Sequence, residues 1–130
     1  LRPSGTVQLL ADASGVQFAS IRALSTVAPT VASGFGSSPA VVGRGWAFTV
    51  NVGTGGVATG GVIAMNTAAT TGWACDVKNL TALAANRADQ QTVQTATSTT
   101  QVTVQNQTIS TGAALAWTAS DVVQLKCSGY

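Results

Sequence analysis

The stretch WAFTVNVGTGG, residues 46–56, decides what kind of protein this chain can be. Its first half alternates large apolar residues with small or polar ones, which is the period of a β-strand with one buried face. Its second half is a glycine cluster, and glycine-rich loops that follow strands can bind phosphate groups. The stretch is therefore either part of a nucleotide site or the corner of a β-sheet.

The residues after the glycine cluster favour the structural alternative. The chain continues as VATGGVIAM, residues 57–65, without the lysine and the helix that a phosphate-binding loop requires. It also lacks the strand–helix–strand context of a dinucleotide-binding fingerprint. We therefore interpret the glycines as a turn or bulge between two strands, where positive φ angles are needed.

The alternation continues to the end of the chain and predicts an all-β fold. In the first strand, Trp46, Phe48, Val50 and Val52 share one face. Further strands are expected at residues 61–65, 73–80, 91–97, 100–106, 113–117 and 122–128. Short strands with Gly, Ser, Asn and Thr turns are typical of a small antiparallel β-sandwich, here expected to be jelly-roll-like.

A helical turn within residues 80–91 is an open alternative to irregular structure. The spacing of its apolar residues would place one set of side chains on the buried side of such a turn: Leu80, Leu83, Ala84 and Arg87.

The chain is expected to have three parts. Residues 1–27 form an extended arm or hairpin, with a turn signal at residues 12–15. Residues 28–44, rich in Pro, Gly and Ser, form a connector, and residues 45–130 form the sandwich domain. The apolar residues of the arm are too few to make a core. We expect them to contact a neighbouring subunit or the main domain: Val7, Leu9, Val16, Phe18 and Ile21.

Composition excludes several classes of function. Of the 130 residues only 8% are charged and the net charge is +2, which is too small and too dispersed for a nucleic-acid surface. No segment has the roughly 18 apolar residues of a membrane span, so we expect no membrane insertion. A surface built mainly from Thr, Ser, Asn, Gln and Gly indicates an extracellular or particle-bound protein.

The chain lacks the side chains that most catalysis requires. It contains no histidine, which excludes Ser–His–Asp and Cys–His arrangements. The four acidic residues are Asp12, Asp76, Asp89 and Asp121, and they lie in different segments. Asp76 and Asp121 could approach each other if their strands pair, but we expect Asp121 to bond to backbone in a turn. We predict no enzymatic activity, no cofactor and no metal site.

Two side-chain questions stay open at this level. Cys75 and Cys127 stand 52 residues apart, point inward with their apolar neighbours, and are either two buried thiols or a disulfide. Trp46, Trp73 and Trp117 are expected in the core, with the alternative that one of them anchors an interface.

Five short motifs resemble a module found near the C-termini of tailed-bacteriophage virion surface proteins. The resemblance covers about residues 30–130 and rests on TVASGFGSSPAVV, AFTVNVGTGG, TGWACDV, AWTASDVV and KCSGY. It implies a non-enzymatic structural protein located in the virion. No binding motif can be transferred from it position by position.

Three functions arise as hypotheses. In the first, the chain is the tip of a fibre or spike, a homo-oligomer, expected to be a trimer, that presents a host-contact surface to a receptor. In the second, it is a capsid decoration or cement protein that contacts other virion proteins through its arm. The third, a secreted carbohydrate-binding module, would require an exposed aromatic platform.

Overall fold

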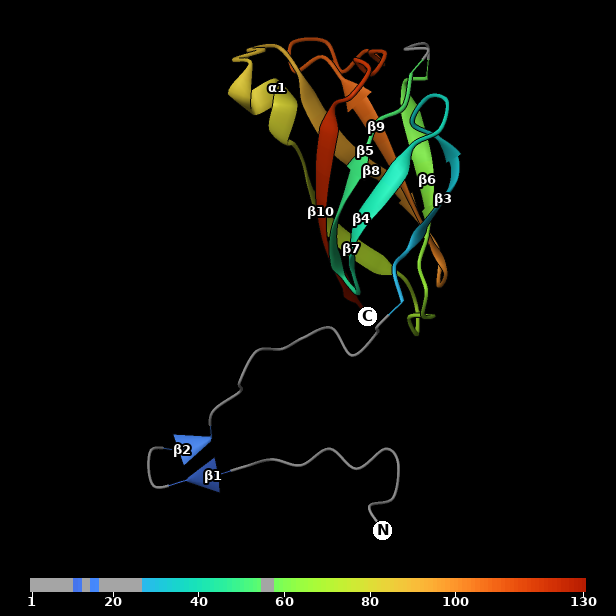
Figure 1. The fold of residues 1–130 in the computed structure, drawn as a ribbon, viewed down its shortest axis with the longest axis vertical. Helices are drawn as coiled ribbons and strands as arrows, with labels where there is room; N and C mark the ends of the chain where they lie inside the picture. Colours follow the sequence, from blue (N-terminus) through green and yellow to red (C-terminus); the bar gives the residue numbers. More distant parts are fainter. Residues whose placement is uncertain (1–10, 13–14, 17–26, 55–57) are drawn as a thin grey trace.

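The computed structural model of the chain describes residues 11–12, 15–16, 27–54 and 58–130. Two antiparallel four-stranded sheets pack face to face (Figure 1). The first sheet has the order β4 (Ala40–Arg44), β5 (Ala47–Asn51), β10 (Val122–Gly129) and β7 (Trp73–Asn79). The second has the order β3 (Thr30–Gly34), β6 (Gly60–Ala64), β9 (Gln101–Gln107) and β8 (Gln91–Thr97). The predicted small all-β sandwich is confirmed.

The core consists of the alternate residues that the sequence pattern predicts for the buried faces. Its main side chains are Phe48 and Val50 from β5, Val123 and Leu125 from β10, Ile63 from β6, and Val102 and Val104 from β9. All of these are at most 3% exposed. Burying each such side chain contributes roughly 1.5–3 kcal/mol, so this two-layer contact is the main favourable term in folding.

Residues 28–44 are part of the sandwich and not a connector. They form β3 and β4, one edge strand of each sheet. The chain crosses between the sheets at Gly34, Phe35 and Gly36, whose φ angles are 76°, 59° and 79°. This left-handed turn costs roughly 1–2 kcal/mol at the non-glycine residue. It places the Phe35 ring in the core, stacked on Trp117 with ring centroids 5.5 Å apart.

Residues 113–117 do not form the predicted strand. They run from β9 toward β10 as extended chain with one isolated bridge, Gln107 to Ala114. Trp117 is nevertheless 2% exposed, because it packs on Phe35. The alternation therefore identifies the buried residue correctly but not the hydrogen-bonded strand.

The helical alternative at the end of β7 is confirmed as one short helix, α1 (Leu80–Ala84). The side that carries Leu83 does not face the core, since Leu83 is 67% exposed and the buried residue of the helix is Ala82. The reason lies in the cap: the Asn79 side chain accepts a hydrogen bond from the backbone N–H of Ala82 at 2.9 Å. This N-cap fixes where the helix starts and hence which side faces inward.

The first glycine of the 53–56 cluster has a packing role. Ser37 and Thr54 exchange backbone hydrogen bonds of 2.7 and 3.0 Å, which bring the turn after β3 against the end of β5. A Cβ atom on Gly53 would lie 1.8 Å from the Ser37 carbonyl oxygen, so only glycine fits there. Gly55 and Gly56 lie outside the described residues.

Cys75 and Cys127 are joined by a disulfide across neighbouring strands. They are directly opposite each other in the β7–β10 register, with Cα atoms 4.0 Å apart. Both side chains are partly buried against the core. The bond closes a loop of 52 residues that contains β8 and β9, so it links the last strand covalently to the middle of the chain.

The edges of β7 and β8 meet along one side of the sandwich, which we call the β7–β8 seam. It is closed by side chains of β8 bonding to the backbone of β7. Gln94 Oε1 accepts from the Cys75 N–H at 2.7 Å, and Gln94 Nε2 donates to the Trp73 carbonyl at 2.7 Å. Thr97 Oγ1 accepts from the Trp73 N–H at 2.8 Å. The first part of the outer edge of β7, at Trp73 and Cys75, is thereby covered, which prevents another strand from pairing there.

The hairpin expected near residues 12–15 is present as β1 (Ala11–Asp12) paired with β2 (Gly15–Val16). Val16 therefore lies in a strand, whereas Val7, Leu9, Phe18 and Ile21 lie outside the described residues, so their expected subunit contacts stay predictions. No helix in the described part of the chain is long and apolar enough to cross a membrane.

Replacing both cysteines by alanine (C75A/C127A) should lower the free energy of unfolding by about 2–4 kcal/mol, because a 52-residue loop is no longer closed in the unfolded chain. Urea unfolding followed by tryptophan fluorescence measures this. The wild-type chain under reducing conditions is the control and should fall to the same stability. No loss in either would contradict a stabilising bond.

Trp73→Ala should cost about 3–5 kcal/mol, because this side chain is 2% exposed and lies in the core. The matched control is Leu83→Ala, which removes an apolar side chain that is 67% exposed and should cost well under about 1 kcal/mol. Equal melting temperatures for Trp73→Ala and the wild type would refute the placement of Trp73.

Candidate functional site

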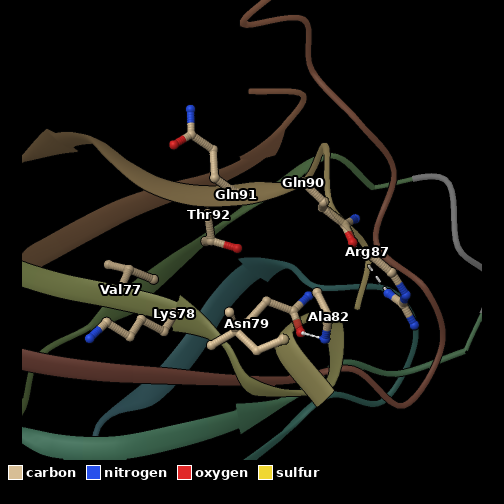
Figure 2. Close-up of a pocket in the computed structure, with 9 residues that line it drawn as sticks. Val77, Lys78, Asn79, Ala82, Arg87, Gln90, Gln91 and Thr92 are labelled. Carbon is tan, nitrogen blue, oxygen red and sulfur yellow. Dashed lines mark hydrogen bonds between the residues drawn. The ribbon is translucent and has the colours of Figure 1, made fainter. Parts of the chain in front are cut away.

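A cleft of about 390 Å³ lies where β7 and β8 separate beyond the seam (Figure 2). The end of β7 and the following α1 form one wall, and the start of β8 forms the other. In Figure 1 this end of the sandwich, marked by α1, is opposite the end where the chain enters β3 and leaves β10. The cleft is therefore at the end of the sandwich opposite the start of β3 and the end of β10.

A buried ion pair supports the α1 wall. Asp121 is completely buried, and Arg87 Nη1 donates to its two carboxylate oxygens at 3.0 and 3.1 Å. Asn79 Nδ2 donates to Asp121 Oδ2 at 2.9 Å, and the backbone N–H of Thr118 donates to the same oxygen at 3.3 Å. One carboxylate thus ties α1, the β9–β10 connection and the cleft together, and its charge is neutralised by Arg87.

The Thr92 hydroxyl has no hydrogen-bond partner in the described structure. The residue is 7% exposed, and its oxygen is covered from water. Figure 2 shows the side chain directed from β8 toward Asn79 and Ala82, across the cleft, whereas Gln91 points to the other side of the strand. A buried hydroxyl without a partner costs free energy, typically about 1–3 kcal/mol. Asn106 Oδ1, on the residue opposite Thr92 in β9, is also unpaired. Buried groups of this kind are met by a bound water, by an ion or by a ligand.

The remaining lining consists of apolar residues, neutral amides and one lysine. Val77, Ala82 and Leu83 supply apolar surface on the α1 side. Gln90 accepts a long hydrogen bond of 3.4 Å from Arg87 Nη1, which leaves its amide N–H groups available. Lys78 is exposed and lies 3.5 Å from the Asp76 carboxylate on the same strand. Each cation of the cleft therefore has a carboxylate beside it, a buried one for Arg87 and an exposed one for Lys78.

The acidic residues do not come together as a catalytic pair. β7 and β10 do pair, but Asp76 is exposed and opposite Lys126, while Asp121 is buried before the start of β10. The predicted backbone bond of Asp121 is confirmed by its contact with the Thr118 N–H. Within the described ranges, no group of three or more His, Cys, Asp or Glu residues could hold a metal ion.

Asp89 anchors the β9–β10 connection beside the cleft. Its carboxylate accepts from the backbone N–H and the hydroxyl of Ser110 at 2.8 and 2.7 Å. The hydroxyl bond first, and the backbone bond second, lower the pKa of Asp89 below its usual 3.8. Because the folded pKa is depressed, this contact stabilises the loop at neutral pH and is lost as the pH falls through the lowered pKa.

A second cleft, of about 310 Å³, lies at the opposite end of the sandwich. It is lined in part by Trp46, Trp73 and Tyr130. Trp73 is almost completely buried and meets the partly buried Trp46 edge-on, with ring centroids 6.0 Å apart. The two tryptophan rings pack against the core, whereas Tyr130 is 58% exposed, so this cleft offers one exposed aromatic ring and not a platform of several.

The cleft is not among the sites that the sequence predicts. The predicted site residues are the two cysteines, which do not line it, and the arm, most of which lies outside the described residues. The sequence pattern places Arg87 only on a helix face, and Thr92 only in a strand. The N-cap signal of Asn79 before an apolar turn is readable from sequence. The pairing of Arg87 with Asp121, 34 residues away, is not.

No protein-family model, no curated protein and no solved structure matches the chain. The geometry of the site is therefore the basis on which a function can be assigned.

Arg87→Met should destabilise the protein by about 2–4 kcal/mol, because it leaves the Asp121 carboxylate buried without its cation. The matched control is Lys78→Met, which breaks an ion pair whose side chains are 56% and 61% exposed and should cost about 0–1 kcal/mol. Thermal unfolding at pH 7 compares the two variants. A similar, small loss in both would contradict the buried ion pair.

Proposed function

We propose that this chain is a non-enzymatic structural module of a bacteriophage particle, at the tip of a fibre or spike, where it presents a host-contact surface. The observation that carries the proposal is the placement of the cleft. In Figure 1 β3 begins and β10 ends at one end of the sandwich, and α1 lies at the other. The cleft, with the unpaired hydroxyl of Thr92, is lined in part by α1. A module built in this way can be attached at one end and make contact at the far end.

The motifs that resemble phage virion proteins coincide with the framework of the fold. TVASGFGSSPAVV spans β3, the Phe35 turn and most of β4. TGWACDV and KCSGY contain the two halves of the disulfide, and AWTASDVV contains Trp117 and Asp121. Apart from Val77, the cleft-lining residues lie outside all five motifs. The resemblance thus concerns a scaffold, and the cleft is the part of this chain suited to a specific role.

The surface chemistry suits assembly by backbone and apolar contacts. The exposed faces of β8 and β9 carry mainly Thr and Gln. β4 is an edge strand whose Val42 is 55% exposed. With few charges to direct association, an edge of this kind pairs with a strand from another subunit. We propose that residues 1–27 supply that strand in a homotrimer.

Deleting residues 1–25 should leave the sandwich folded but convert the trimer to monomers. Native mass spectrometry and light scattering of the two chains measure the oligomeric state, and circular dichroism checks that the fold is retained. A truncated chain that still forms trimers would show that the arm is not the contact.

The copy number of the chain in purified particles separates the tip from capsid decoration. Quantitative mass spectrometry should give a small multiple of three copies per particle if the chain forms fibre or spike tips. Hundreds of copies would instead establish the decoration function and overturn the proposal.

A further inference from the structure

We infer that the cleft between β7, α1 and β8 binds a neutral sugar that carries an acetamido group. The ligand's methyl group packs on Val77 and Ala82, and its carbonyl oxygen accepts a hydrogen bond from the Thr92 hydroxyl. This inference deepens the proposed function and rests on it for its biological meaning, since it names what a host-contact module would recognise. The binding chemistry itself depends on the cleft alone.

The cleft floor sets the chemistry of the buried part of the ligand. Its surface is mainly apolar, and Thr92 offers the one unpaired polar atom among the described floor residues. A fully hydroxylated ring face would lose hydration there without gaining enough partners, which costs free energy for each unpaired hydroxyl. An acetamido group fits better, because it combines a methyl group with a single carbonyl that Thr92 can satisfy.

The charges at the cleft favour a neutral ligand. Arg87 is neutralised by Asp121 at 3.0 Å, and Lys78 by Asp76 at 3.5 Å. An anionic sugar would have to compete with these carboxylates for each cation, and a cationic ligand would meet no free carboxylate among the described lining residues. The Gln90 amide and the Arg87 N–H groups that do not face Asp121 remain as donors for ring hydroxyls at the rim.

Size and strand edges favour a sugar over a peptide. A volume of about 390 Å³ accommodates a single ring with its substituent. An extended peptide would need a run of open backbone groups to pair with, but Gln94 and Thr97 occupy the outer edge of β7 at Trp73 and Cys75, which leaves only its last residues beside the cleft. Because the Thr92 oxygen is covered in the free protein, entry requires a rim side chain to move. Leu83, 67% exposed, and Gln90, held by a 3.4 Å hydrogen bond, are the least fixed.

The test uses the full 130-residue chain, labelled with ¹⁵N and titrated with methyl N-acetyl-β-glucosaminide. We expect saturable amide shifts confined to residues 77–92. Methyl β-glucoside, which lacks the acetamido group, should bind at least about tenfold more weakly. Equal binding of the two glycosides, shifts centred on Trp46 and Tyr130, or no shift at roughly 50 mM ligand would each overturn the inference. Equal binding of N-acetylalanine methylamide would assign the cleft to peptides instead.

Thr92→Val separates a ligand-binding role from a structural one. It replaces the hydroxyl by a methyl group of similar shape, so the free protein should keep or raise its melting temperature, while glycoside affinity falls about tenfold. The matched control is Thr95→Val, an exposed residue of the same strand, which should change neither. A lower melting temperature for Thr92→Val would show that the hydroxyl already has a structural partner, and unchanged affinity would show that it does not meet the ligand.

Cell binding distinguishes failure of this inference from failure of the proposed function. Labelled wild-type chain that binds the glycoside in the cleft but does not bind bacterial cells would refute host contact and leave the sugar site standing. Cell binding that is unaffected by Thr92→Val would support host contact and overturn the cleft as its site.

Discussion

The β7–β8 seam is the contact on which the rest of this structure depends. Two sheets that pack face to face leave four strand edges open, and unpaired backbone groups at an edge must be satisfied by something. Here Gln94 bonds to both a donor and an acceptor of β7, as a neighbouring strand would, and Thr97 satisfies a third group. The seam thus joins the sheets on one side without merging them into one.

The seam also explains where the cleft is. The seam ends near Cys75 and Gln94. Beyond this point β7 continues to Asn79 and leads into α1, and no hydrogen bond of the seam joins it to the start of β8. The gap is held open by the N-cap of Asn79 on α1 and by the buried Arg87–Asp121 pair behind it. Because these contacts fix the backbone of the walls, binding requires only a rim side chain to move, which favours affinity for a small ligand. The disulfide between β7 and β10 fixes the same wall at its other end.

Much of the fold can be predicted from the local pattern of apolar and polar residues. The alternation of apolar and polar residues in β5 correctly predicts that Phe48 and Val50 are buried. With a period of two and one buried face, only one assignment of residues to the two faces is possible. The turn after Gly34 could not be predicted, since a phenylalanine at positive φ is stable only when Trp117 and Gly61 are already beside it. Residues 28–44 resemble a connector in sequence because their glycines and prolines lie in or next to strands of only five residues, which are too short to show a clear alternation.

The site was less predictable than the fold for the same reason. The importance of Asp121 depends on Arg87 and Asn79, which are 34 and 42 residues distant in sequence. Thr92 looks like any threonine in a β-strand until the structure shows that nothing among the described residues meets its hydroxyl. Whether a side chain has a hydrogen-bond partner far away in the sequence cannot be predicted from the residues next to it. The prediction of no enzymatic activity rests on composition alone, because a chain without histidine or glutamate has few means of general acid–base catalysis.

Amide hydrogen exchange tests the seam most directly. The N–H groups of Trp73 and Cys75 face away from β10 and are bonded only to side chains of β8. If the seam closes the sandwich, these two amides exchange nearly as slowly as those of Val123 and Leu125 in the middle of the first sheet. Exchange of Trp73 and Cys75 at the rate of an unprotected peptide, with the rest of β7 protected, would show an open edge and contradict a closed seam.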